Sequence, residues 1–131
     1  MKKLLLAIAV LHTVCVAASS RQLHIIPQPV RAELREGVFA APGCRITAKG
    51  FPSQPGDLLR LASELAAPRE KGSSRRGANT LLLRLDTTAG IPCEGYRIRV
   101  TPHSAQLTAG DESGIFYGLQ TLLQAADANG N

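Results

Sequence analysis

The segment of residues 94–124 reads EGYRIRVTPHSAQLTAGDESGIFYGLQTLLQ, and its patterns decide the fold expected for this chain. Its first part, YRIRV, alternates apolar residues with Arg97 and Arg99. That alternation predicts a strand with one apolar face and one basic, solvent-exposed face. TPHS has the composition of a turn, and AQLTA follows it as a partner strand. We therefore expect an antiparallel hairpin here.

The second part of the segment predicts a helix of about four turns. Its apolar residues recur at helical spacing and are Ile115, Phe116, Leu119, Leu122, Leu123 and Ala126. Gly114 and Gly118 lie one turn apart, and each costs about 1 kcal/mol of helix propensity relative to Ala. Such a cost is best explained by close packing, so we expect this helix to lie directly on a sheet.

Upstream of this segment, the sequence predicts further short elements. NTLLLRLDT, residues 79–87, has the pattern of a strand whose first half is buried. Between Asp57 and Ala67, leucines and alanines at helical spacing predict a helix that Asp57 caps and Pro68 ends. CRITA, residues 44–48, indicates a strand, and VRAEL and GVFA, within residues 30–40, indicate a hairpin before it.

This order of elements predicts one domain of the α+β class. The chain has 131 residues, which suffices for one ordinary domain with its own core. Strands, a helix, three strands and a final helix favour two helices that cover one face of a mainly antiparallel sheet.

The N-terminus has the pattern of a signal peptide. Lys2 and Lys3 precede the apolar run LLLAIAVLHTVCV, which is short for a membrane span. Small residues follow, so we expect cleavage after Ala18. Residues 1–18 are then the signal peptide and 19–131 the domain, which would be exported to the periplasm or the medium and have no membrane association. Lipidation at Cys15 is the alternative, but HTVC lacks the residues that a lipoprotein signal usually has before its cysteine.

Charge and cysteines give little sign of a binding partner. The net charge falls from +5 to +3 once Lys2 and Lys3 are removed. The basic cluster PREKGSSRRG, residues 68–77, contains no aromatic residue, which favours a solvated loop over nucleic-acid binding. No spacing of His and Cys suits a metal, and we expect no cofactor. Cys44 and Cys93 could form a disulfide after export, which the sequence leaves open.

The adjacent pair Asp111 and Glu112 raises the question of catalysis. Glycoside hydrolysis uses two carboxyl groups, one of which protonates the leaving oxygen. These two residues lie at the predicted start of a helix, where a carboxylate caps free N–H groups and suits the helix dipole. We therefore interpret them as turn and capping residues, and we expect no catalytic residue in this chain.

Several motifs together resemble one enzyme family. The motifs are Ile26-Pro27-x-Pro29, Glu94-Gly95-Tyr96 and the run GIFYGLQTL, residues 114–122. They resemble the N-terminal, non-catalytic domain of family 20 glycoside hydrolases, the β-N-acetylhexosaminidases. The resemblance covers residues 23–126, in order and spacing as well as in composition.

The resemblance implies a zincin-like topology without a metal, beside a catalytic (β/α)₈ barrel that this chain does not contain. It also implies that terminal N-acetyl-β-hexosaminides are hydrolysed in that barrel by substrate-assisted catalysis, so that the chain alone is inactive. The alternatives are the N-terminal domain of another carbohydrate-active barrel enzyme and a stand-alone interaction module. If a barrel is the partner, we expect an exposed patch near Tyr117, Leu123 and Gln124, and self-association of the isolated chain.

Overall fold

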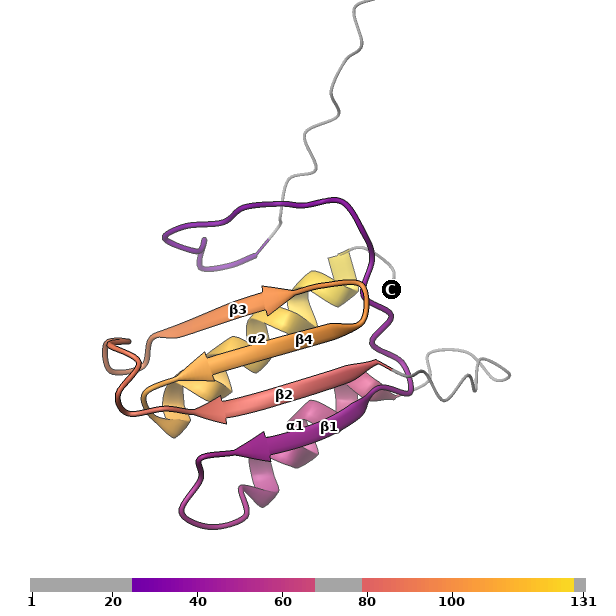
Figure 1. The fold of residues 1–131 in the computed structure, drawn as a ribbon. Helices are drawn as coiled ribbons and strands as arrows, with labels where there is room; N and C mark the ends of the chain where they lie inside the picture. The colour runs from indigo at the N-terminus through magenta and orange to yellow at the C-terminus, as the bar shows by residue number, and fades with distance from the viewer. Residues whose placement is uncertain (1–24, 68–78, 129–131) are drawn as a thin grey trace, which may run out of the picture.

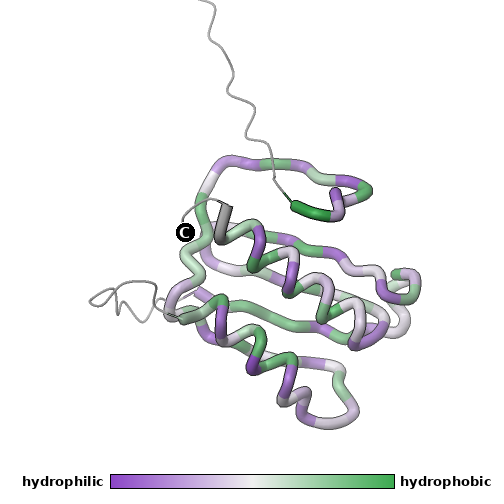
Figure 2. Tube along the Cα trace, turned by 180° about the vertical axis from the view of Figure 1, so that it is seen from behind, coloured by the Kyte–Doolittle hydropathy of each residue, from purple (hydrophilic) through white to green (hydrophobic). Residues whose placement is uncertain are grey.

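The computed structural model describes residues 25–67 and 79–128 and shows a four-stranded sheet covered by two helices. The strands are β1 (Arg45–Lys49), β2 (Thr80–Leu85), β3 (Tyr96–Val100) and β4 (Ser104–Ala109). The helices are α1 (Gly56–Ala66) and α2 (Glu112–Ala128), and both lie on the same face of the sheet (Figures 1 and 2). The predicted α+β class and the position of the helices are thus confirmed. The predicted signal peptide, Cys15, His24 and the basic cluster lie outside the described residues.

The sheet is mixed, so the prediction of a mainly antiparallel sheet is wrong. The strand order is β1-β2-β4-β3; β2 pairs in parallel with β1 and with β4, and only β3 and β4 are antiparallel. The physical reason is the connection between β1 and β2. Helix α1 carries the chain back along the sheet, so that β2 starts at the same end as β1. The zincin-like topology stays a prediction.

The core lies between the sheet and the helices. Its largest fully buried side chains come from β2, β4 and α2, and they are Leu81, Leu83, Leu107, Ile115 and Leu119. Two of them, Leu81 and Leu83, belong to β2, the strand with the most apolar sequence. A central position, with β1 on one side and β4 on the other, removes the most apolar area of this strand from water.

Helix α2 approaches the sheet closely at its two glycines, as predicted. A side-chain carbon added at Gly114 would overlap the carbonyl oxygen of Gly95, and one added at Gly118 would overlap the side chain of Leu107. Further along the helix, the hydroxyl of Tyr96 on β3 lies 2.6 Å from that of Thr121. The two glycines therefore lower the intrinsic stability of the helix but let it lie closer to the sheet than a larger residue would allow.

Helix α1 starts differently from its predicted form but ends just before Pro68, as predicted. Pro55 is its N-cap and no side chain caps its first turn, so the predicted capping role of Asp57 is wrong. Ala67 is extended, with φ −66° and ψ 139°. The residue before a proline avoids helical backbone angles, which explains why Ala67 is extended and the helix ends at Ala66.

The predicted N-terminal hairpin is absent. Residues 25–44 contain no strand and run beside β3 before they reach β1 (Figure 1). Val30, Leu34 and Val38 are exposed, so the apolar side chains of the predicted hairpin strands lack the packing that a stable hairpin needs. Its beginning is held instead by Gln124 on α2, whose amide accepts a hydrogen bond from the Ile26 N–H (2.9 Å) and donates one to the Ile26 carbonyl (3.1 Å).

Among the described residues, no helix is both long enough and apolar enough to cross a membrane.

Candidate functional site

Asp111, one of the two carboxylates with a possible catalytic role, is the N-terminal cap of α2. It lies between β4 and α2, and its Oδ1 accepts a hydrogen bond from the Gly114 N–H at 2.7 Å. Its Oδ2 accepts one from the Glu94 N–H at 2.9 Å, which fixes the loop before β3 to the start of the helix. Glu94 has a φ of 61°, so this bond holds a residue in the left-handed region. The predicted capping role of Asp111 is confirmed.

The electrostatics of Asp111 are those of a cap and differ from those of a general acid. The backbone N–H groups of Glu94 and Gly114, together with the Cys93 thiol, hold the pKa of Asp111 below its ordinary value. A general acid needs a raised pKa in order to carry a proton near neutral pH. Glu112 is the exposed first residue of α2, where the helix dipole favours its charge. That neither residue is catalytic stays a prediction.

The two described cysteines are free thiols. Cys44 is buried beside β1 and Cys93 is exposed in the loop before β3. Burial raises the pKa of the Cys44 thiol, and the hydrogen bond to Asp111 with its negative charge raises that of Cys93. Because the thiolate is the nucleophile, a raised pKa makes both thiols poorly reactive.

Within residues 25–67 and 79–128, no three His, Cys, Asp or Glu side chains gather as a metal site would require. His103 is exposed in the turn between β3 and β4. The part of the chain that the structure describes therefore offers no donor set for a metal.

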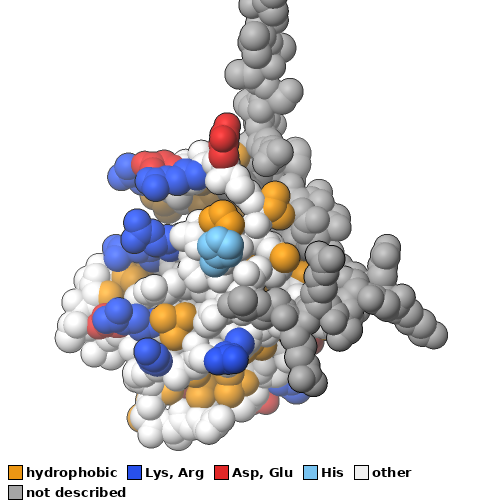
Figure 3. Space-filling model, turned by 45° about the vertical axis from the view of Figure 1, so that its right-hand side comes forward, with side chains coloured by type: hydrophobic (Ala, Val, Ile, Leu, Met, Phe, Trp, Pro, Cys, Tyr) orange, Lys and Arg blue, Asp and Glu red, His pale blue; other side chains and the backbone are white. Residues whose placement is uncertain are grey.

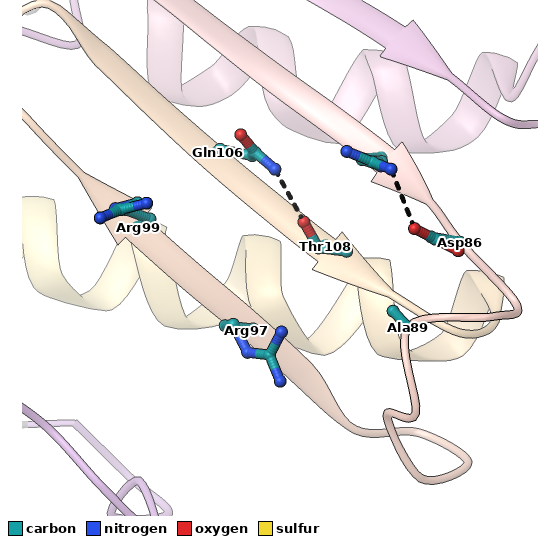
Figure 4. A pocket seen from close by; sticks show the side chains of 7 residues that line it. Asp86, Ala89, Arg97, Arg99, Gln106 and Thr108 are labelled. Carbon is teal, nitrogen blue, oxygen red and sulfur yellow. Dashed lines mark hydrogen bonds and ion pairs between the residues drawn. The ribbon is translucent and has the colours of Figure 1, made fainter.

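The face of the sheet that the helices leave open contains a basic hollow of about 380 Å³. Figure 4 shows Arg97 and Arg99 following one another along β3, with Gln106 and Thr108 beside them on β4. Its lining residues are Arg84, Asp86, Ala89, Arg97, Arg99, Gln106 and Thr108. The alternation in YRIRV predicted a basic face on β3. No local pattern indicated that Arg84 lies in the same hollow, because this depends on the pairing of β2 with β4.

Asp86 is the acidic residue of this hollow, and its carboxylate already accepts hydrogen bonds from Thr88 and Arg84. Thr88 donates hydrogen bonds to Asp86 Oδ1 from its hydroxyl (2.7 Å) and its N–H (3.0 Å), and these lower the pKa of Asp86. The nearby Arg84 lowers it further, with its Nη2 3.0 Å from Oδ2. The carboxylate therefore stays charged and partly offsets Arg84, while no ion pair among the described residues includes Arg97 or Arg99.

A second surface feature is an exposed aromatic pair on α2. The rings of Phe116 and Tyr117 meet edge to face, with centroids 5.6 Å apart, and both side chains are more than two-fifths exposed. The prediction of an exposed Tyr117 is confirmed, whereas the assignment of Phe116 to the buried stripe is wrong. Leu123 and Gln124 do not form the predicted patch, because Leu123 packs against the core and Gln124 holds Ile26.

Comparison with known proteins shows the family of this chain and a similarity to a named enzyme. The family model described as "Glycosyl hydrolase family 20, domain 2" matches residues 22–131. A protein named beta-hexosaminidase from Porphyromonas gingivalis (strain ATCC BAA-308 / W83) is 33% identical over 72 residues, which are 55% of this chain and 9% of that protein. The match thus spans less than a tenth of that relative's length. No solved structure matches the chain.

Proposed function

Since the chain belongs to glycosyl hydrolase family 20, domain 2, we propose that it is the non-catalytic scaffold domain of an exported β-N-acetylhexosaminidase. The parent enzyme hydrolyses terminal N-acetyl-β-hexosaminides in a (β/α)₈ barrel that packs beside this domain, and the domain follows the family's zincin-like topology. The observation that carries the proposal is the family match over residues 22–131. The capping role of Asp111 supports it, because this carboxylate is used for structure.

The coding sequence is the first test. We expect the longer open reading frame that contains this chain to encode a barrel-length segment with an Asp-Glu pair at the end of a barrel strand. A complete reading frame without such a segment would contradict the proposal and favour a stand-alone module.

An activity assay is the second test. The chain alone should not hydrolyse an aryl N-acetyl-β-glucosaminide, whereas the longer enzyme should. Turnover by the purified chain that disappears in Glu112→Gln would overturn the non-catalytic assignment. Asp57→Asn is a suitable control, because Asp57 is an exposed carboxylate on the other helix.

Phe116 and Tyr117 are the surface that we assign to the barrel contact. Aromatic side chains are costly to leave in water and are enriched at protein interfaces. Both lie in the first two turns of α2, the last described element, so a following domain would reach them by packing back along this helix. In the isolated chain this surface would be uncovered, so self-association is expected.

The contact can be tested by Tyr117→Asp in the longer enzyme. A buried charge should separate the two domains, so the linker should become more sensitive to protease and the barrel should unfold at a lower temperature. Val30→Asp is the matched control, because Val30 is a fully exposed apolar residue on the N-terminal segment. Equal effects of the two substitutions would remove α2 as the contact surface.

A further inference from the structure

On the open face of the sheet, a row of paired residues crosses all four strands, and three of its four members are cations. Lys49 on β1 is paired with Arg84 on β2, Arg84 with Thr108 on β4, and Thr108 with Arg97 on β3. Paired residues of neighbouring strands point to the same face. Because strands lie about 4.8 Å apart, Arg84 and Arg97 start about 10 Å from each other. Arg99 follows Arg97 on the same face, about 6.7 Å further along the strand.

Positive charge on this face is largely uncompensated. Arg45 lies on the same face of β1 as Lys49, since alternate residues of a strand share a face and both belong to the same alternating set. Asp86 is the acidic residue of the hollow and is already bonded to Arg84 and Thr88. Among the ion pairs of the described residues, none includes Arg97 or Arg99. Figure 3 shows Lys and Arg side chains at several separate places on the side of the molecule in view.

The spacing and the neighbours of these cations indicate the kind of ligand. Guanidinium groups bind carboxylates and sulfates through paired hydrogen bonds, and here they are spread along a surface instead of converging in one deep pocket. Gln106 and Thr108 lie between the cations; the Gln106 amide donates a hydrogen bond to the buried Thr108 hydroxyl (3.2 Å), and its carbonyl oxygen can accept one from a ligand hydroxyl. Single-stranded nucleic acid would require aromatic side chains for stacking, and the hollow has none. An anionic membrane would favour apolar side chains that insert, and Ala89 is the hollow's one aliphatic side chain.

We propose that the open face, centred on Arg84, Arg97 and Arg99, binds a linear acidic polysaccharide whose sugar units carry carboxylate groups. The choice of a polysaccharide over other polyanions rests on the proposed function, because a domain of a glycosidase meets sugar chains. The face lies opposite the helices, so a chain bound there leaves Phe116 and Tyr117 free for the barrel. The domain would then hold an acidic glycan while the barrel acts on its N-acetylhexosamine ends.

Polygalacturonate is the probe, with dextran as the neutral polysaccharide of similar bulk. We expect the purified protein to bind polygalacturonate at low salt, to lose affinity as salt is added, and not to bind dextran. The double variant Arg97→Gln/Arg99→Gln should bind about tenfold more weakly or not at all, since it removes two charge-assisted contacts. The control is Arg60→Gln with Arg31→Gln, which removes the same charge from α1 and the N-terminal segment.

Each outcome decides the proposal. A thermal unfolding curve of Arg97→Gln/Arg99→Gln that matches the unaltered protein establishes that weaker binding is not misfolding. An equal loss of polygalacturonate affinity in the control variant would show that only the net charge of the protein matters, and would overturn the proposed site. Tighter binding of oligo(dT) or of phosphatidylglycerol vesicles than of polygalacturonate would overturn the proposal that the ligand of this face is a glycan. Hydrolysis of a neutral aryl N-acetyl-β-glucosaminide by the longer enzyme should be unchanged in the double variant, so a failed binding test leaves the proposed function standing.

Discussion

The two faces of the sheet are built from alternate residues of the same strands, yet one is covered by the helices and apolar whereas the other is open and basic. On β4, Leu107 and Ala109 point to the helices and are fully buried, while Thr108 between them lines the basic hollow. The helix-covered face gains stability from the apolar area that it removes from water. The open face keeps its charges in solvent, where they add little to stability and are available to a ligand. Neighbouring residues of one strand therefore serve different ends: one side chain stabilises the fold, and the next is available to a ligand.

The largest effect should come from Leu107→Ala on the covered face. Leu107 is fully buried and contacts α2 at Gly118, so its truncation leaves a cavity and should cost about 2–5 kcal/mol of unfolding free energy. Urea denaturation would measure this. The matched control is Gln106→Ala, the adjacent residue on the open face, which should cost less than about 1 kcal/mol. Equal losses at the two positions would break the contrast between the faces.

A somewhat smaller effect is expected for Gly118→Ala, which tests the contact between α2 and β4 from the other side. The added methyl group overlaps Leu107, and overpacking of this kind costs about 1–3 kcal/mol, partly offset by the higher helix propensity of Ala. In the double variant with Leu107→Ala, the methyl group added at position 118 fits into the space that the leucine side chain leaves. The double variant should thus lose less than the sum of the single losses, and strict additivity would show that the two residues do not compete for space.

The smallest effect concerns Asp111 and appears only at low pH. Its folded-state pKa is lowered, so its contribution to stability is present above its unfolded pKa, about 3.9, and is lost as the pH falls through the folded pKa. Asp111→Asn keeps an acceptor oxygen but removes the charge. Its melting temperature should therefore fall less steeply between about pH 5 and pH 2 than that of the unaltered protein.

Asp57→Asn is the matched control for this pH series, because Asp57 lies in the first turn of α1, where no side chain caps the helix. Asp111→Asn should change the pH dependence of stability more than Asp57→Asn does. If the two variants behaved alike, the hydrogen bonds from Glu94 and Gly114 would carry no charge-dependent stability.

Most of the elements could be predicted from short stretches of sequence. Both helices, β2 and the β3-β4 hairpin were predicted within one or two residues, because their apolar residues recur at the spacing of the element itself. The N-terminal hairpin failed for the same reason: VRAEL and GVFA are too short for such a spacing to be distinctive, and no neighbouring surface covers their apolar residues. At the candidate site, the basic face of β3 and the cap at Asp111 were predicted, since each depends on residues close in sequence.

The sequence by itself determined the elements, the cap and the family resemblance, because these depend on local patterns and on motifs that can be compared directly. Only the tertiary structure decided which strands are neighbours, and with it that Arg84 joins Arg97 and Arg99 across β4. It also decided that Asp111 reaches Glu94, and that Gln124 binds Ile26 from 98 residues away. The physical reason is that pairing between distant segments depends on the burial of all segments together. No short stretch contains that information.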